Sequence, residues 1–236
     1  MTIIAMWSGP RNLSTAMMRS WENRADTTVL DEPLYAAYLA ATQLDHPGRE
    51  EIIAGGPADY EQAIAMCVDA DGGQDGAISY QKHMTHHLLA DVRRDWLGGF
   101  RNCLLLRDPR RVLASYTQVR DTVTLEDIGV PQQLELADHC ELVIDSDDFL
   151  TDPEGHQREI CRRLDVLFDP AMLSWPAGPR DSDGVWAPHW YSAVESSTGF
   201  GPPTSEPPPP AAAHLAAIAA DALEIHQQLR TRRLTL

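Results

Sequence analysis

The sequence predicts an α/β fold, a three-layer sandwich in which helices cover both faces of a central parallel sheet of four or five strands. Short apolar runs alternate along the chain with segments whose apolar residues recur at helical spacing. This alternation is typical of strand–helix–strand units. A length of 236 residues is enough for one well-buried domain and too short for two comfortable ones. We therefore expect residues 1–236 to form a single domain.

The first predicted unit is a strand, a turn and a helix at the N-terminus. Residues 2–7 (TIIAMW) are a continuous apolar run, which indicates a buried strand. Residues 8–12 contain Gly and Pro and predict a turn, and residues 13–24 follow as a helix. Residues 27–30 predict a second strand, which ends at the sequence Asp-Glu-Pro.

The next predicted unit places a third strand after a helix. Residues 59–71 have a helical pattern, and the glycine-rich stretch 72–76 (GGQDG) predicts a turn. Residues 77–82 then form a strand, and residues 85–96 are expected to be a helix.

Residues 100–106 (FRNCLLL) are the clearest strand of the chain, and residues 110–120 predict the helix after it. Residues 141–145 (ELVID) form a last strand, followed by a helix over residues 154–167. The sheet therefore has strands that are each followed by a helix, as a parallel arrangement requires.

The C-terminal part has a different character. Residues 169–210 are rich in proline and show little periodicity, so we expect an irregular segment with a stiff, extended end at residues 207–210. Residues 211–230 are rich in alanine and predict a helix that docks on the body of the protein.

The charge of the chain argues against several kinds of partner. Acidic residues outnumber basic ones by 35 to 19, which gives a net charge of −16. Such a charge repels nucleic acids and anionic membrane surfaces, so we expect neither as a partner. The sequence contains no apolar run of about 18 residues and no N-terminal signal pattern, which predicts a cytoplasmic protein. Oligomeric state cannot be inferred from the sequence.

Cysteine spacing argues against a disulfide framework and against a zinc site. Cys67, Cys103, Cys140 and Cys161 are widely separated and form no CxxC pair. We expect four buried, reduced thiols.

The turn after the first strand has the composition of a phosphate-binding loop. The N-terminus of a helix offers unpaired N–H groups and the positive end of a dipole, and Arg11 adds a fixed charge. The loop lacks the GxxxxGK[ST] pattern of a Walker A motif. The alternative is an ordinary turn in which Ser14 caps the helix. The candidate anion-binding residues are Gly9, Arg11, Asn12, Leu13, Ser14 and Thr15.

A second basic residue follows the strand at residues 100–106. Arg107 stands at the end of this strand, and Ser115 lies about two turns into the next helix. A guanidinium and a hydroxyl placed in this way can converge on one phosphate. Alternatively, Arg107 pairs with Asp108 or Asp31, and Ser115 is a small packing residue.

The two motifs together resemble one enzyme family. PRNLST in the first loop and RDPRRVLASY after the later strand are similar to sequences of sulfotransferases that use 3′-phosphoadenylyl sulfate, most closely a small bacterial subgroup. Residues 145–154 (DSDDFLTDPE) and 190–200 (WYSAVESSTGF) also resemble segments of that family. The resemblance spans most of the chain and implies a P-loop NTPase-like fold.

The resemblance also implies roles for these residues. Arg11, Ser14 and Thr15 match the family's loop for the 5′-phosphosulfate, and Arg107 and Ser115 match its 3′-phosphate pair. It implies transfer of a sulfuryl group to a hydroxyl or amine of a small-molecule acceptor. The donor leaves as 3′,5′-ADP, and no metal is required.

Sulfuryl transfer needs cations near the leaving group and a base for the acceptor proton. Arg11 and Lys82, the only lysine of the chain, are the candidate cations. For the base we rank Glu32 first, His83 second and His87 third, since each follows or ends a predicted strand at the same sheet edge.

Two alternatives remain open. Residues 104–108 (LLLRD) can be a strand with a magnesium-binding Asp, which would indicate a nucleotide or small-molecule kinase. Leu13, where most sulfotransferases have Gly, and Lys82-His83-Met84 in place of K-x-H favour a non-catalytic binding protein. An aromatic acceptor pocket would use Tyr35, Tyr38, Trp175, Trp186, Trp190 and Tyr191.

Overall fold

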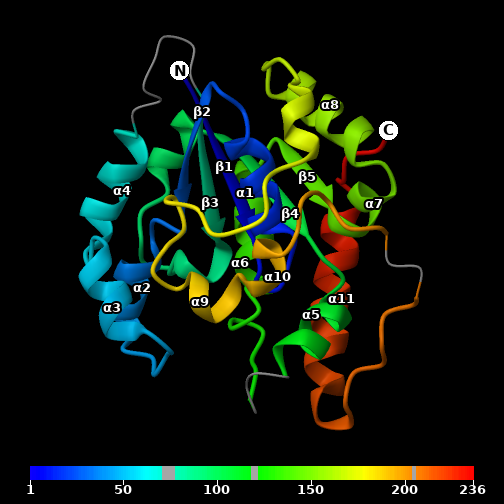
Figure 1. The fold of residues 1–236 in the computed structure, drawn as a ribbon. Coiled ribbons are helices and arrows are strands. Elements are labelled where there is room, and N and C mark those ends of the chain that lie inside the picture. The colour runs from blue at the N-terminus through cyan, green and yellow to red at the C-terminus, as the bar shows by residue number, and fades with distance from the viewer. Residues whose placement is uncertain (71–77, 118–121, 204–205) are drawn as a thin grey trace.

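The computed structural model has one parallel sheet with the strand order β2-β3-β1-β4-β5 (Figure 1). It describes residues 1–70, 78–117, 122–203 and 206–236, and the strands are counted within these ranges. The strands are β1 Thr2–Ser8, β2 Thr27–Asp31, β3 Ile78–Met84, β4 Arg101–Leu106 and β5 Leu142–Asp145. The predicted fold class and all five predicted strands are confirmed.

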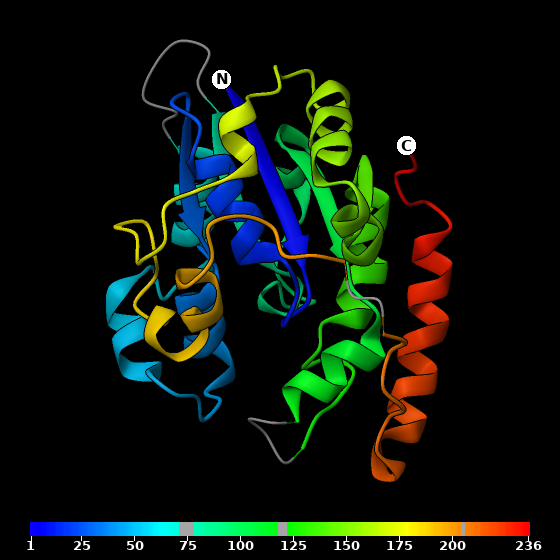
Figure 2. The ribbon, with the colours of Figure 1, turned by 45° about the vertical axis from the view of Figure 1, so that its right-hand side comes forward.

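Alternate side chains of the central strand β1 build two separate cores. Ile4 and Met6 pack in one cluster with the helix α1 (Ser14–Glu22). Ala5 and Trp7 belong to a second cluster on the opposite face, together with residues of α4 (Tyr60–Val68). Because successive side chains of a strand point to opposite faces, the sheet is covered on both sides, as Figure 2 shows.

Further helices surround this sheet (Figures 1 and 2). They are α2 Tyr35–Thr42, α3 Arg49–Gly55, α5 Pro109–Tyr116, α6 Val130–Leu136, α7 Ser146–Thr151, α8 Pro153–Arg163, α9 Ala187–Trp190, α10 Ser192–Glu195 and α11 Ala216–Arg230. The long C-terminal helix α11 docks against α5, α6 and β5, as its apolar residues predict.

The predicted helix at residues 85–96 is wrong. The structure has a single 3-10 turn at Thr85–His87 and another at Asp95–Gly99, with Leu88 in an extended conformation between them. Leu88 is buried in the core beside α4, and Tyr60 donates a 2.7 Å hydrogen bond to the carbonyl oxygen of His87. These tertiary contacts outweigh the helical spacing of the sequence.

Other boundaries differ by a few residues. β3 continues past residue 82 to Met84, so Lys82 and His83 are both strand residues. The turn at 72–76, Ala77 and the predicted end of the helix at 118–120 lie outside the described residues. The sequence did not predict α7, whose N-terminus is capped by the side chain of Asp145.

The C-terminal segment is mostly irregular, as predicted, although it contains the short helices α9 and α10. Its polar contacts attach it to the sheet edge: Arg19 of α1 pairs with Asp183 at 2.7 Å, and the Gly184 N–H donates to Asp31. The Gly184 contact therefore places this part of the segment at the carboxyl end of β2.

All four cysteines are free and buried, as predicted. Burial raises the pKa of Cys67 and of Cys140 to about 12. Within the described ranges, no helix is both long enough and apolar enough to cross a membrane.

Candidate active site

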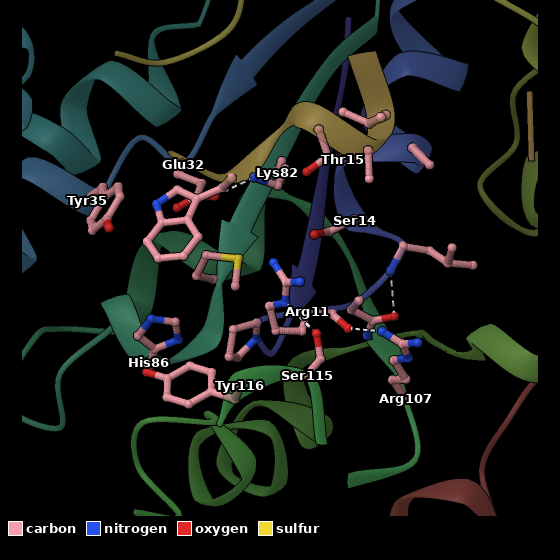
Figure 3. Close-up of a pocket in the computed structure, with 18 of the residues that line it drawn as sticks. Arg11, Ser14, Thr15, Glu32, Tyr35, Lys82, His86, Arg107, Ser115 and Tyr116 are labelled. Carbon is pink, nitrogen blue, oxygen red and sulfur yellow. Dashed lines mark hydrogen bonds and ion pairs between the residues drawn. The ribbon is translucent and has the colours of Figure 1, made fainter. Parts of the chain in front are cut away.

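A cavity of about 480 Å³ opens at the carboxyl edge of the sheet (Figure 3). Its size is typical of pockets for a cofactor or small molecule, and parallel α/β sheets bind ligands at this edge. The predicted anion-binding and catalytic residues that line it are Arg11, Asn12, Leu13, Ser14, Thr15, Glu32, Lys82, His87, Arg107 and Ser115. The structure thus brings together nearly all of the residues predicted from the sequence.

The loop after β1 is held by its own polar groups. Arg11 has a positive φ of 57°, which turns the chain sharply. The Asn12 amide donates to the Leu105 carbonyl oxygen at 2.9 Å, and its Oδ1 accepts from the Leu13 N–H at 2.8 Å. This side chain therefore ties the loop to β4.

The N-terminus of α1 faces the cavity through Ser14 and Thr15. The first helical hydrogen bond runs from the Met17 N–H to the Leu13 carbonyl oxygen. The N–H groups of residues 14–16 consequently have no acceptor within the helix. In the described part of the chain no side chain caps this end, so the alternative in which Ser14 is a cap is wrong. These groups are suited to hold an anion.

Two arginines and a serine connect this loop to α5. Arg11 Nε donates to Ser115 Oγ at 2.8 Å, and the Arg107 guanidinium donates to the Arg11 carbonyl oxygen (Figure 3). Asp108 pairs with Arg110 at 2.7 Å, so the alternative pairing of Arg107 with Asp108 is not found. Burial, together with the neighbouring arginines, lowers the pKa of Arg107. A bound anion would relieve this crowding of cations.

Lys82 lies in a buried polar cluster rather than in solvent. Its ammonium contacts Asp31 at 2.9 Å, Tyr191 Oη at 2.7 Å and one carboxylate oxygen of Glu32. Tyr191 in turn donates to Asp31 at 2.7 Å and accepts a 3.0 Å hydrogen bond from Trp186 Nε1. The cluster links β2, β3 and the C-terminal segment.

Glu32 is buried at the cavity wall and also has a positive φ, of 44°. Its N–H donates to the Lys82 carbonyl oxygen at 2.9 Å, which fixes the backbone in this conformation. Burial raises the pKa of Glu32, and the charge of Asp31 adds to this effect, while Lys82 opposes it. Burial disfavours the charged form of Lys82, but Asp31 and Glu32 outweigh that effect, and its pKa is raised well above the usual value. Lys82 is therefore a permanent cation beside a carboxylate of increased basicity.

The prediction that His83 belongs to the site is wrong. Its ring stacks on Trp7 at 4.3 Å, on the face of the sheet opposite to Lys82, and Nε2 lies 3.1 Å from Gln81 Oε1. Burial lowers the pKa of His83 to about 3. Strand alternation explains its position, because Lys82 and His83 are successive residues of β3.

Gly9 also does not line the cavity. An added Cβ at this position would lie 2.6 Å from the Ile128 carbonyl oxygen and 2.6 Å from Gln133 Nε2. Gly9 therefore allows close packing beneath the loop, and the unusual backbone angle occurs at Arg11.

The far wall of the cavity is largely aromatic and neutral. Tyr35 and Trp190 line it, as predicted, and Tyr38 packs behind them against His87. Trp186 and Tyr191 are buried behind the wall, and Trp175 contacts Phe200 outside it. The sequence analysis missed His46, Met84 and Tyr116 as lining residues, and Asp31 as a partner of Lys82. Of these four residues, Asp31 could have been found from the sequence, since it follows a predicted strand and so lies at this edge of the sheet.

Residues 1–233 match the family model described as the sulfotransferase domain. This chain belongs to the sulfotransferase domain family. Two curated relatives from Arabidopsis thaliana carry the names branched-chain-amino-acid aminotransferase-like protein 1 and protein 2. They are 36% identical over 90% of this chain and 33% identical over 88% of it. The chain spans only 39% and 38% of the length of these relatives.

Solved sulfotransferase domains have the same fold. One from the curacin biosynthetic pathway is 15% identical, with a TM-score of 0.58 and coverage of 97% of both chains. A sulfotransferase from Alicyclobacillus acidocaldarius is 12% identical, with a TM-score of 0.53 over 99% of this chain and 97% of the other. At such low identity the likeness concerns the fold alone.

Proposed function

We propose that this sulfotransferase-domain protein moves a sulfuryl group from 3′-phosphoadenylyl sulfate to a hydroxyl or amine of a small molecule. The observation that carries the proposal is the link between Arg11 in the first loop and Ser115 on α5 at one cavity. It brings the first loop and α5, each of which carries a candidate anion-binding group, to the same cavity.

The residues fit such a donor. The helix N-terminus at Ser14 and Thr15 and the Arg11 guanidinium would hold the 5′-phosphosulfate, and Arg107 and Ser115 would hold the 3′-phosphate. The bound donor supplies the sulfuryl group on a phosphosulfate linkage. In a chain of net charge −16, cations gathered at one cavity indicate a built anion site.

Glu32 is the group best placed to take the acceptor proton. It lines the same cavity as Arg11, and burial raises its pKa towards the range in which a carboxylate is an effective base. Lys82 already donates to three acceptors of the protein, so its role is to hold Glu32 rather than to contact the transferred group. The aromatic wall at Tyr35 and Trp190 would contact the acceptor.

A thermal-shift comparison tests the donor class. 3′,5′-ADP at about 100 times its dissociation constant adds roughly 2.7 kcal/mol of stability, which raises the melting temperature by about 5–10 °C. Adenosine 5′-monophosphate, which lacks the 3′-phosphate, is the matched control and should give a smaller shift. The shift with 3′,5′-ADP should persist in a chelator.

Other outcomes would overturn the proposal. A shift only with ATP and magnesium would support the kinase alternative. No shift with any of these ligands would support a binding protein without this donor. Binding of 3′,5′-ADP without transfer to any acceptor would support a non-catalytic member of the family.

A further inference from the structure

The two carboxylate oxygens of Glu32 have different surroundings. Oε1 accepts a hydrogen bond from Lys82, whereas Oε2 lies 3.8 Å from Nδ1 of His87. This asymmetry assigns different tasks to the two oxygens, and the inference drawn from it rests on the proposed role of Glu32 as base.

Lys82 fixes Oε1 firmly. A lysine ammonium has three N–H donors, and those of Lys82 are directed to Asp31, Glu32 and Tyr191. Because Asp31 and Tyr191 are themselves hydrogen-bonded to each other, the ammonium cannot turn without breaking several contacts. Oε2 is therefore the oxygen left to take a proton from an acceptor in the cavity.

His87 is held rigidly beside that oxygen. Its ring stacks on Tyr35 at 4.2 Å with an interplanar angle of 19°, and on Tyr38 at 4.8 Å with an angle of 27°. The residue is only 2% exposed and lines the cavity. Its Nδ1 has no hydrogen-bond partner among the residues that the structure describes. A buried polar atom left in this state calls for an explanation, and here it belongs to a residue that lines the cavity and lies 3.8 Å from Glu32 Oε2.

The surroundings keep this imidazole neutral. Burial lowers the pKa of His87 well below its usual value, and the nearby His86, Lys82, His46 and His83 act in the same direction. A neutral imidazole has one nitrogen that donates and one that accepts. It can therefore accept a hydrogen bond without competing with Lys82 as a cation.

We propose that His87 is a positioning residue for Glu32, and that its Nδ1 accepts a hydrogen bond from Oε2 once that oxygen has taken the acceptor proton. The proton comes from the acceptor hydroxyl or amine and stays on Glu32, and the imidazole keeps the single proton that it already has. His87 thus stabilises the protonated form of Glu32, which Lys82 on the other oxygen disfavours.

Two substitutions separate this role from simple packing. His87→Phe keeps a flat ring between Tyr35 and Tyr38 but removes the nitrogen, whereas His87→Asn loses the stacking and keeps an acceptor near the position of Nδ1. The measured reaction is release of sulfate from 3′-phosphoadenylyl sulfate with water as the surrogate acceptor. We expect His87→Phe to lower kcat at least tenfold with little change in KM, and His87→Asn to stay within about threefold of the wild type.

The pH dependence of kcat distinguishes the hydrogen bond from packing, because a loss of packing alone would not shift the acidic limb. The groups that face Glu32 are Lys82 of β3, Asp31 of β2, Tyr191 of the C-terminal segment and His87 itself. A hydrogen bond to the protonated carboxyl raises its pKa, so its loss in His87→Phe should move the acidic limb of kcat to lower pH by roughly half to one unit. An unchanged limb and unchanged kcat in His87→Phe would overturn the proposal.

A measurement without turnover tests the same contact. In Glu32→Gln, Lys82 needs an oxygen acceptor, so the amide NH₂ must occupy the side of Oε2 and donate to His87 Nδ1. The ¹⁵N resonance of Nδ1, assigned with His87→Phe, should shift towards the hydrogen-bonded value in Glu32→Gln, and the ring should stay neutral between pH 5 and 8. An identical His87 Nδ1 resonance in the wild type and in Glu32→Gln would contradict the proposal.

Different results would refute the proposed function and the role of His87. If the wild type does not bind 3′,5′-ADP, the proposed function is refuted, whatever the effect of the His87 substitutions. Normal 3′,5′-ADP binding in all variants with no effect of His87→Phe on kcat, pH profile or resonance would refute the role of His87 alone.

Discussion

Arg11 Nε lies 2.8 Å from Ser115 Oγ, which joins two residues that are 104 positions apart in the chain. Arg107 completes the arrangement by donating to the carbonyl oxygen of Arg11. The loop after β1 and α5 therefore form one continuous surface of the cavity, on which Arg107 supports the backbone of Arg11. A change on one side of the surface should affect ligand binding on both sides.

Replacing Arg107 should weaken the binding of 3′,5′-ADP. Arg107→Ala removes a charged donor that lines the cavity and the support of the Arg11 carbonyl oxygen. A charge-assisted hydrogen bond contributes about 1.5–3 kcal/mol, so the dissociation constant should rise about 10- to 100-fold in titration calorimetry. Arg110→Ala is the matched control, because Arg110 pairs with Asp108 outside the cavity, and it should bind nearly as the wild type. Equal affinities of the wild type, Arg107→Ala and Arg110→Ala for 3′,5′-ADP would show that Arg107 does not contribute to binding.

Replacing Glu32 should separate binding from turnover. Glu32→Gln keeps the size of the side chain and an oxygen for Lys82 but removes the base. Turnover should fall by roughly 10²- to 10⁴-fold, and the dissociation constant for 3′,5′-ADP should change less than about threefold. The exposed Glu224→Gln on α11 is the control for general effects. Full activity of Glu32→Gln would show that another group takes the proton.

Removing the buried cation should destabilise the protein. Lys82→Met leaves Asp31 and Glu32 side by side without their partner, and breaking a buried pair in this way costs about 3–5 kcal/mol of unfolding free energy. Arg158→Met, on the surface of α8, should cost under about 1 kcal/mol. Urea unfolding of both variants measures the difference, and similar midpoints would argue against a structural role of Lys82.

The effect of Lys82→Met should also depend on pH. Loss of the ammonium raises the pKa of Glu32 further, because this cation opposes the effect of burial. Because the pKa of Glu32 is higher in the folded protein than its unfolded value of 4.5, Glu32 favours the folded state most below pH 4.5. This contribution to the free energy of unfolding is lost as the pH rises and the folded protein has to give up the proton. The difference in unfolding free energy between the wild type and Lys82→Met should therefore be largest near neutral pH and should become smaller towards pH 4.5. A deficit that is constant over this range would contradict the assignment.

The hydroxyl of Tyr191 should contribute more to the stability of the fold than the hydroxyl of Tyr60. Tyr191→Phe removes the group that contacts Lys82, Asp31 and Trp186, and we expect a loss of about 1–3 kcal/mol. Tyr60→Phe removes the hydrogen bond that the Tyr60 hydroxyl donates to the His87 carbonyl oxygen, and it should lose about 1 kcal/mol. Amide exchange near residues 184–191 should be faster in Tyr191→Phe only. Equal exchange in both variants would show that Tyr191 does not anchor this segment.

Local sequence was sufficient to locate the strands and the residues at their ends. The carboxyl ends of parallel strands meet at one edge, so Arg11, Glu32 and Arg107 could be assigned to one site before any contact was known. The end of β3 was placed at residue 82, two residues early, and this error led to His83 being included in the site. With the strand continued to Met84, alternation assigns His83 to the opposite face.

Contacts between distant segments could not be predicted in this way. Lys82 and Tyr191 are 109 positions apart, and nothing in the local pattern around either residue indicates the other. The 3-10 turn at Thr85–His87, which brings His87 to Glu32, replaces a predicted helix because Leu88 is drawn into the core.

The sequence alone therefore determined the layered sheet, the loop after β1 and the charged residues at the strand ends, because these depend on local periodicity and on the order of strands and turns. The tertiary structure decided which charges are paired, which oxygen of Glu32 accepts from Lys82 and which histidine lies beside the other oxygen. These properties depend on burial and on long-range packing, since desolvation and the approach of Lys82, Asp31 and His87 set the basicity of the carboxylate only when the chain is folded.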